Sequence, residues 1–168
     1  HEGRGLIMPV WVIVILAILM VIGSVVWVRP SPRDQRLALW RRDAIVAGLK
    51  VKLEGLPAEP KDSGIRHEVG EVSYILYNHA PIKGDDKRWA VAHHEGWMND
   101  GLPSGWSWHK EEVASLAGSI SECIKNAPLP ILAVERTPYL SRIVWNESAG
   151  NFDSKQLKSY LESVQLIS

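Results

Sequence analysis

The sequence predicts an α+β protein with an N-terminal transmembrane helix, followed by a small antiparallel sheet with helices packed on one face. Three observations predict this class. Residues 6–28 carry no charged side chain. Five later stretches are rich in β-branched and aromatic residues, and amphipathic helical patterns stand before, between and after them. Such an order is typical of helices covering an antiparallel sheet.

Length and charge bound the classes of function. A chain of 168 residues suffices for one soluble domain beside the apolar segment. Its 19 basic and 19 acidic side chains cancel, which argues against a bulk electrostatic affinity for nucleic acid. The single cysteine, Cys123, excludes a disulfide framework and a multi-cysteine zinc site.

The apolar segment is predicted to cross a membrane. As a helix, residues 6–28 would be about 34 Å long, enough for a hydrocarbon core of about 30 Å. Trp11 and Trp27 lie near its two ends, where indole rings favour the membrane interfaces. A cleaved signal peptide is the alternative, but the run exceeds the usual apolar core of about 7 to 15 residues and no small-residue cleavage site stands out. We therefore expect the segment to be retained.

The basic residues around the segment predict its orientation. Only Arg4 precedes the segment, and five arginines follow it closely: Arg29, Arg33, Arg36, Arg41 and Arg42. By the positive-inside rule the C-terminal domain is expected in the cytoplasm, and the unpaired Cys123 fits a reducing compartment. Met8 is a plausible start, in which case residues 1–7 are an upstream extension.

Four parts are predicted along the chain: a tail over 1–5, the transmembrane helix over 6–28, a basic juxtamembrane helix over 29–48 and a soluble α+β domain over 49–168. The juxtamembrane helix is expected to be capped by Ser31, to begin with Pro32 and to end at Gly48. Its apolar stripe is Leu37, Trp40, Ala44 and Ala47. Its arginines would either touch anionic lipid headgroups or form a solvated face.

The first three strands of the domain are predicted within 49–94. Residues 49–53 alternate as a short strand, and 54–70 read as a loop rich in glycine and proline. Residues 71–80 and 87–94 read as two strands, which the intervening turn would join into a hairpin.

The second half begins with a predicted ordered loop over 96–108, whose indoles pack on the sheet. A helix is expected from about Lys110 to Asn126, because its apolar residues recur at helical spacing. A second hairpin is expected around Pro138. The last helix has the clearest signals: Asp153 as the cap, Gln156 completing a capping box, and Phe152 stapled onto Leu157.

No constellation of residues predicts catalysis. The histidines are His1, His67, His79, His93, His94 and His109. In the predicted hairpin His79 and His93 lie several residues apart, and the adjacent His93 and His94 point to opposite faces of a strand. The sequence has no nucleophile elbow, phosphate-binding loop or dinucleotide fingerprint. We therefore expect no metal site, no cofactor and no enzymatic activity.

Tryptophan is the unusual residue of the soluble part. Trp89, Trp97, Trp106 and Trp108 lie close together in sequence, and indole rings often anchor interfaces. They predict either a Trp-lined cleft that binds a partner or ligand, or a small sheet whose core depends on indoles.

The chain resembles a family of single-pass proteins of gammaproteobacteria without known activity. The resemblance covers the span, the basic stretch RPSPRDQRLALWRRDAIVAGLKVKL and the C-terminal unit AVERTPYLSRIVWNESAGNFDSKQLKSYLESV. Some members are loosely labelled preprotein translocase subunit YajC. Genuine YajC proteins share the span followed by Arg-Pro, but they are shorter and lack the two helices predicted after the first hairpin. The resemblance implies a location in the bacterial inner membrane, and no translocase role is carried over.

These observations predict a membrane-anchored accessory or scaffolding subunit. Its cytoplasmic domain would bind another membrane or cytoplasmic protein, and its other partner would be the lipid bilayer. A ligand-binding or sensory module that uses the tryptophan-rich region is the alternative. A periplasmic carbohydrate-binding domain is a third interpretation, which requires the inverted topology.

Overall fold

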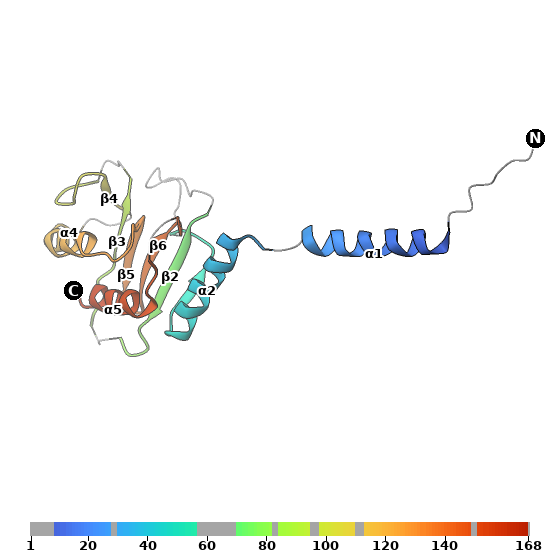
Figure 1. Cartoon of the computed structure of the whole chain (residues 1–168). Coiled ribbons are helices and arrows are strands. Elements are labelled where there is room, and N and C mark those ends of the chain that lie inside the picture. The colour runs from blue at the N-terminus through green and yellow to red at the C-terminus, as the bar shows by residue number, and fades with distance from the viewer. Residues whose placement is uncertain are drawn as a thin grey trace, which may run out of the picture. The chain divides into compact units, whose positions relative to one another are not determined.

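The computed structural model describes residues 9–27, 30–56, 70–81, 84–94, 98–109, 113–148 and 151–167, with the backbone alone for 24–27. The chain divides into two compact units, His1–Arg36 and Leu37–Ser168. The second unit combines helices with an antiparallel sheet (Figure 1), so the predicted α+β class is confirmed.

Helix α1 spans Val10–Trp27 in the first unit. It falls inside the apolar segment, whose aliphatic residues have no proline or charge to interrupt a helix after Pro9. Within the described residues, no helix combines the length and the apolar character needed to cross a bilayer.

The sheet has six described strands in the order β1-β2-β6-β5-β3-β4, and every neighbouring pair is antiparallel. The strands are β1 (Lys50–Lys52), β2 (Val72–Tyr77), β3 (Trp89–His93), β4 (Trp106–Trp108), β5 (Ala133–Thr137) and β6 (Leu140–Trp145). The two central strands, β6 and β5, are the hairpin predicted around Pro138. That prediction is confirmed by the pairing of Thr137 with Leu140.

The other predicted hairpin is wrong. Strands β2 and β3 do not pair; β2 pairs with β1 and β6, and β3 pairs with β4 and β5. A physical reason lies in the residues between them. Asp85, which lies in the segment expected to form the turn, instead binds the guanidinium of Arg136 on β5.

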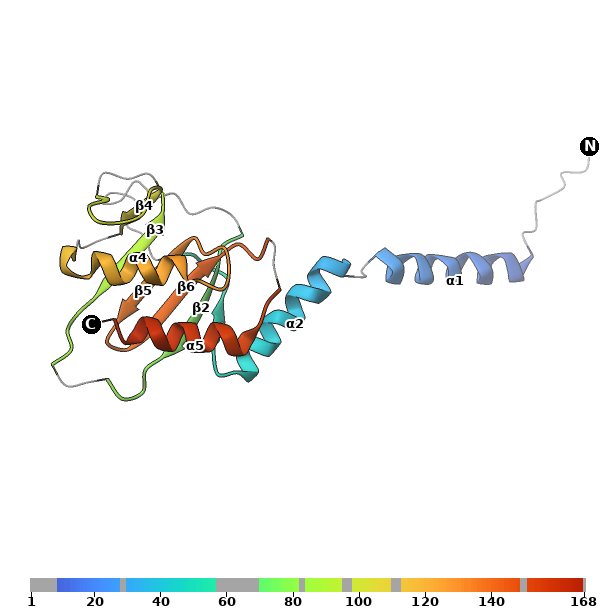
Figure 2. The same ribbon diagram turned by 60° about the vertical axis from the view of Figure 1, so that its left-hand side comes forward.

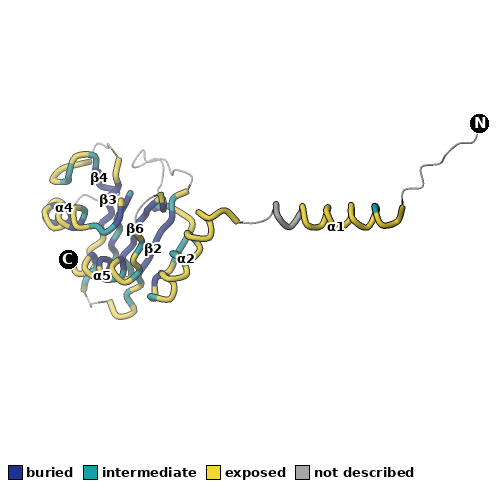
Figure 3. Tube along the Cα trace, in the orientation of Figure 1, coloured by how far each residue is buried: buried dark blue, intermediate teal, exposed yellow. Residues whose placement is uncertain are grey.

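Helices α2 (Pro32–Val46), α4 (Ala117–Lys125) and α5 (Ser154–Gln165) cover one face of the sheet (Figure 2). The main core lies between them and includes Ala44 of α2, Ile120 of α4 and Leu161 of α5. Figure 3 shows the buried residues concentrated in the strands and the exposed ones on the outer sides of these helices. The prediction of helices on one face is therefore confirmed.

Helix α2 begins as its capping residues predict. The backbone N–H of Asp34 donates to Ser31 Oγ at 3.1 Å, and the backbone N–H of Ser31 donates to Asp34 Oδ2 at 3.3 Å. This reciprocal contact is a capping box with aspartate in the third position. The helix ends before Gly48, whose φ of 94° favours glycine.

The region over 98–126 differs in two respects from the prediction. Residues 106–108 form strand β4 instead of ending a loop, because Trp106 pairs with His93 and Trp108 with Val91. The predicted helix begins later, with the 3-10 turn η1 (Ala114–Leu116) leading into α4. Residues 110–112 lie outside the described residues.

The opposite face of the sheet carries several small residues and the ion pair of Arg142 with Glu135. Ala90, Ala92, Ala133 and Val144 are buried in a second, smaller cluster with Leu56. On the same face, Arg142 Nε lies 3.2 Å from Glu135 Oε2 at paired positions of β6 and β5. Alternation along the strands therefore separates a bulky helix-facing side from a flat side with small residues.

Candidate functional site

The structure separates the four candidate tryptophans. Trp89 and Trp108 are buried in the core, where they pack beneath the helices. Trp97 lies outside the described residues. Trp106 is also buried, and it lines a groove at the surface. The structure thus places all three described indoles in the core, and one of them, Trp106, also lines a surface groove.

The groove lies where three segments converge: the carboxyl end of α4, the segment leading into β5, and the β3–β4 pair. Its volume is about 370 Å³. Its lining residues are His93, Trp106, Ile124, Ala127, Leu129, Pro130, Ile131 and Leu132. We refer to this surface as the α4–β4 groove.

The floor of the α4–β4 groove is apolar and its rim is accessible. Trp106, Leu129 and Ile131 are buried, while His93 and Pro130 are exposed. Apolar lining with few polar groups is characteristic of binding sites. The groove therefore has an apolar floor and a solvent-accessible rim.

The wall over 129–132 is fixed by its backbone. The N–H of Ile131 donates to the carbonyl of Leu129 at 2.8 Å, around Pro130, which is a tight turn closed by a single hydrogen bond. The N–H of Leu132 donates to Val144 and its carbonyl accepts from His93, both at 2.7 Å. The wall is thus tied to strands on both sides.

His93 supplies the polar side chain of the groove. Its ring meets Trp106 edge-on, with centroids 5.5 Å apart and planes at 68°. Gly105, at φ 81°, leaves room for the imidazole, because a Cβ there would approach His93 Nε2 to 3.2 Å. His94 is exposed beside it. The imidazole therefore lies edge-on against the indole, in space that Gly105 leaves open.

The outer edge of β4 is covered by the chain that precedes it. The N–H of Trp108 donates to the carbonyl of Met98 at 2.7 Å, and that of Trp106 donates to Pro103 at 3.1 Å. The indole N–H of Trp108 also donates to Asp100 at 3.2 Å. These N–H groups are used, so an added strand has no row of free donors at this edge.

The predicted membrane-surface residues fall into different environments. Arg33, Arg36 and Arg42 are exposed along α2, and Trp11 of α1 is 63% exposed. Arg29 and the side chain of Trp27 lie outside the described residues. Arg41 faces the sheet instead, where its guanidinium forms an ion pair with Glu147. Of the four arginines that the structure describes, three are thus exposed and Arg41 is engaged with Glu147.

Glu147 is a residue that sequence reasoning missed. Its side chain is buried, with 4% of the residue exposed. The carboxylate accepts a hydrogen bond from the Tyr74 hydroxyl at 2.6 Å and another from Arg41 Nε–H at 3.0 Å. Burial, followed by the hydrogen bond to Glu147, raises the pKa of Tyr74, so the hydroxyl stays protonated as a donor. We refer to Glu147, Tyr74 and Arg41 as the α2 clasp.

An aromatic cluster lies beside the α2 clasp. Trp40 of α2 stacks on Trp145 of β6 at 5.7 Å between centroids, and Phe152 stacks on both rings at 5.8 and 6.1 Å. Tyr74 tilts against Trp145 and Phe152. Phe152, expected to staple α5, thus belongs to a cluster joining α2 to the sheet.

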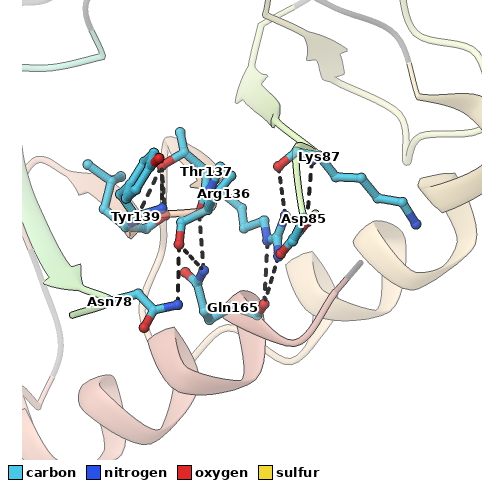
Figure 4. A network of polar contacts seen from close by, with 9 residues as sticks. Asn78, Asp85, Lys87, Arg136, Thr137, Tyr139 and Gln165 are labelled. Atoms are coloured by element: carbon cyan, nitrogen blue, oxygen red, sulfur yellow. Dashed lines mark hydrogen bonds and ion pairs between the residues drawn. The ribbon is translucent and has the colours of Figure 1, made fainter. Parts of the chain in front are cut away.

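A polar network lies at the end of the sheet that contains the β5–β6 turn (Figure 4). Arg136 is 1% exposed and points its guanidinium at Asp85, at the Lys87 carbonyl (2.7 Å) and at the Gln165 carbonyl (3.3 Å). The side chain of Gln165 in turn donates to the Thr137 carbonyl at 3.0 Å. These contacts satisfy a buried cation, which identifies the network as structural.

The remaining reactive side chains do not gather into a site. Cys123 is buried, and its Sγ lies 3.1 Å from the hydroxyl of Tyr160. Burial raises the pKa of the Cys123 thiol, although the Tyr160 hydrogen bond opposes the shift. Among the described residues, no group of three or more His, Cys, Asp or Glu side chains is placed to hold a metal ion.

Comparisons with known proteins give no match: no family model and no curated protein matches the sequence, and no solved structure matches the fold.

Proposed function

We propose that the chain is an accessory or scaffolding subunit, anchored to the bacterial inner membrane by residues 6–28, whose folded part binds a protein partner in the cytoplasm. The observation that carries this proposal is the exposure of α1. Trp11, Leu19 and Met20 are 63%, 59% and 81% exposed, and the described side chains of α1 are exposed except Val12, which is intermediate (Figure 3). Continuous apolar surface of this kind favours a lipid or protein environment.

The flanking sequence supports the proposed anchor. The apolar run continues beyond the described side chains of α1 at both ends, from Leu6 to Val28. Arg33, Arg36 and Arg42 follow it with exposed side chains, each of which would contribute roughly 1 kcal/mol near an anionic surface. The resemblance to single-pass inner-membrane proteins agrees with this location.

The folded part supports binding over chemistry. The reactive side chains that the structure describes in this part are dispersed, whereas the α4–β4 groove presents an apolar floor at the surface. Trp89 and Trp108 are buried, so they do not form the cleft that a ligand-binding module would need. Binding of a protein partner is therefore the better supported role.

Alkaline carbonate extraction of membranes tests the anchor. The full chain, expressed in a bacterium, is expected to stay in the pellet. Replacing Leu16 and Ile18 with arginine should release it, because each arginine at the centre of a span costs about 2.5 to 3.5 kcal/mol. Leu39→Arg, at an exposed position of α2, is the matched control and should stay in the pellet. Release of the wild-type chain would contradict the anchor.

Crosslinking in native membranes, followed by mild detergent extraction, tests the partner. We expect a companion protein at fixed stoichiometry. A chain that is recovered as a monomer after crosslinking, with no companion, would contradict the accessory role.

A further inference from the structure

We propose that the outer face of α2 lies in the headgroup layer of the bilayer, with Leu39 and Val46 directed toward the acyl chains and Arg42 bound to a lipid phosphate. This inference rests on the proposed function, because the anchor brings α2 to the membrane. It adds a second membrane contact, which the folded part makes itself.

Helix α2 carries apolar residues on two faces. Its inner face packs on the sheet through Trp40 and the fully buried Ala44. Arg42 lies two residues from each of them, about 160° around the helix axis. Leu39 precedes Arg42 by three residues and Val46 follows it by four, so the three share one side of the helix. Leu39 and Val46 are 55% and 80% exposed. We refer to these three residues as the outer face of α2.

The inner contacts fix which side of α2 faces outward. Arg41 forms the ion pair with Glu147, and Trp40 stacks on Trp145 at 5.7 Å between ring centroids. These contacts come from adjacent residues of α2 and therefore hold the rotation of the helix about its axis. The outer face cannot turn toward the sheet unless both contacts break, so it stays on the surface of the folded part.

The length of chain between the anchor and α2 selects the bilayer as the occupant of the outer face. Helix α1 ends at Trp27 and α2 begins at Pro32, and a connection of this length reaches at most about 18 Å. With residues 6–28 in the bilayer, the start of α2 lies in or beside a headgroup layer about 5 to 7 Å thick. So short a tether raises the effective concentration of lipid at the outer face, and a weak contact suffices.

The composition of the outer face also favours lipid over protein. Arg42 stands between Leu39 and Val46, and charged residues are depleted from the centre of protein interfaces because an unpaired buried charge is costly. In a headgroup layer the apolar stem of an arginine lies beside the inserted residues, while its guanidinium reaches the phosphates. The planar guanidinium also matches a phosphate with two hydrogen bonds. The outer face therefore fits a phospholipid surface.

An adjacent carboxylate opposes the attraction to anionic lipid. Asp43 is exposed and lies one turn after Leu39 on the same side of α2. Lipid phosphates would repel Asp43 and attract Arg42, so removing the two charges should shift the contact in opposite directions. These neighbouring residues therefore test the role of charge without changing the apolar residues of the outer face.

Quenching by lipids that carry a nitroxide tests the contact. Leu39→Cys and Val46→Cys are each labelled with a polarity-sensitive fluorophore in the full chain, in nanodiscs that contain nitroxide lipid and an anionic phospholipid. Cys123 is buried, so the label goes to the introduced thiol. Leu166→Cys is the matched control, since this leucine after α5 is 80% exposed. We expect the two α2 probes to be quenched at least about two-fold more strongly than the Leu166 probe.

Two substitutions in the Leu39→Cys background test the charges. Arg42→Gln should lower the ratio of docked to undocked α2 about five-fold, as measured from the quenched fraction, and Asp43→Asn should raise it. Arg88→Gln removes an exposed arginine before β3 and should leave the ratio unchanged. Near-ultraviolet circular dichroism of each variant checks the fold.

Three outcomes would overturn the inference: α2 probes quenched no more than the Leu166 probe, quenching that Arg42→Gln leaves unchanged, or blue-shifted emission without quenching, which would show that protein covers the outer face.

Failure of the anchor is separable from these outcomes. If carbonate releases the wild-type chain, the labelled full chain is mixed with preformed vesicles that contain the nitroxide lipid. Quenching there would support the outer face although the anchor has failed. Conversely, a chain that resists carbonate and shows no extra quenching of the α2 probes would support the anchor and overturn the contact of the outer face.

Discussion

Glu147 has an unfavourable backbone conformation, which is stabilised by the contacts of its side chain. Its φ of 53° makes it the one described residue other than glycine with a positive φ. Left-handed backbone is uncommon for a residue with a side chain. The ion pair with Arg41 and the hydrogen bond from Tyr74 keep the carboxylate buried in that position, and they join α2 to β2.

Glu147→Gln is expected to lower the free energy of unfolding by about 1 to 3 kcal/mol, because Arg41 loses a partner that is largely shielded from water. Urea denaturation followed by tryptophan fluorescence measures the change. The exposed Glu162 provides the control, since Glu162→Gln should have little effect. Adding Arg41→Met to Glu147→Gln should cost less than Arg41→Met alone, since the pair is already broken. Additive losses would contradict the clasp.

Asp85 gives stability a dependence on pH. The hydrogen bond from Arg136 lowers the pKa of the Asp85 carboxyl in the folded protein. A lowered pKa contributes stability that is present above the unfolded value of about 3.9, and this stability is lost as pH falls through the folded value. Acidification should therefore weaken the wild-type protein by protonating Asp85.

Asp85→Asn should lose this contribution at neutral pH and show a smaller further loss on acidification. Urea midpoints of both proteins at about pH 7 and about pH 3 measure it, and the comparison cancels the other carboxylates, which the two proteins share. Equal losses on acidification would show that Asp85 does not contribute through Arg136.

At the scale of elements, two glycines near α4 differ in whether the structure requires them. Gly101 has φ 77°, and a Cβ there would approach Ala117 Cβ to 2.6 Å. Gly118 lies inside α4, where an added Cβ meets no atom within 4 Å. The first glycine permits the loop to approach the helix, and the second only loosens the helix.

The two substitutions are expected to have opposite signs. Gly118→Ala should raise the free energy of unfolding by roughly 0.5 to 1 kcal/mol, because alanine restricts the unfolded chain and favours helix. Gly101→Ala should lower it by about 1 kcal/mol or more, through backbone strain and the contact with Ala117. Thermal unfolding of both variants, compared with the wild-type protein, measures the two changes in stability. A stabilising Gly101→Ala would show that the loop does not need this approach.

Elements with local signals could be predicted from the sequence. Asp153 caps α5 by accepting the N–H groups of Lys155 and Gln156 at 2.9 and 3.3 Å, as its position before an amphipathic run indicates. Strand β4 could not be predicted, because its three residues are too few to show a period. Its formation depends on pairing with β3, which the local sequence does not encode.

At the scale of the whole molecule, strand order was the feature least accessible from sequence. The turn-like residues between β2 and β3 indicate a hairpin, yet β6 and β5 lie between these strands. Six residue pairs join β2 to β6 and match Tyr74 with Ile143 on the core face, so long-range burial outweighed the local turn signal. The α4–β4 groove was missed for the same reason, since its lining comes from β3, β4, α4 and the chain before β5.

The orientation that we propose for the chain in the membrane can be tested with one introduced thiol. The arginines after the apolar segment predict a cytoplasmic domain. Cys123 is buried and its pKa is raised by burial, so the native thiol should react slowly with maleimide. Tyr139 is 58% exposed in the β5–β6 turn. Tyr139→Cys therefore places a reactive thiol on the folded part against a quiet background.

A membrane-impermeant maleimide should label the Tyr139→Cys variant in inverted inner-membrane vesicles and leave it unlabelled in intact spheroplasts, because the reagent does not cross the bilayer. The wild-type chain controls for Cys123 and should stay unlabelled in both preparations. Labelling in intact spheroplasts would place the domain in the periplasm. Exposure to that compartment would exclude cytoplasmic partners and favour the interpretation as a periplasmic carbohydrate-binding domain.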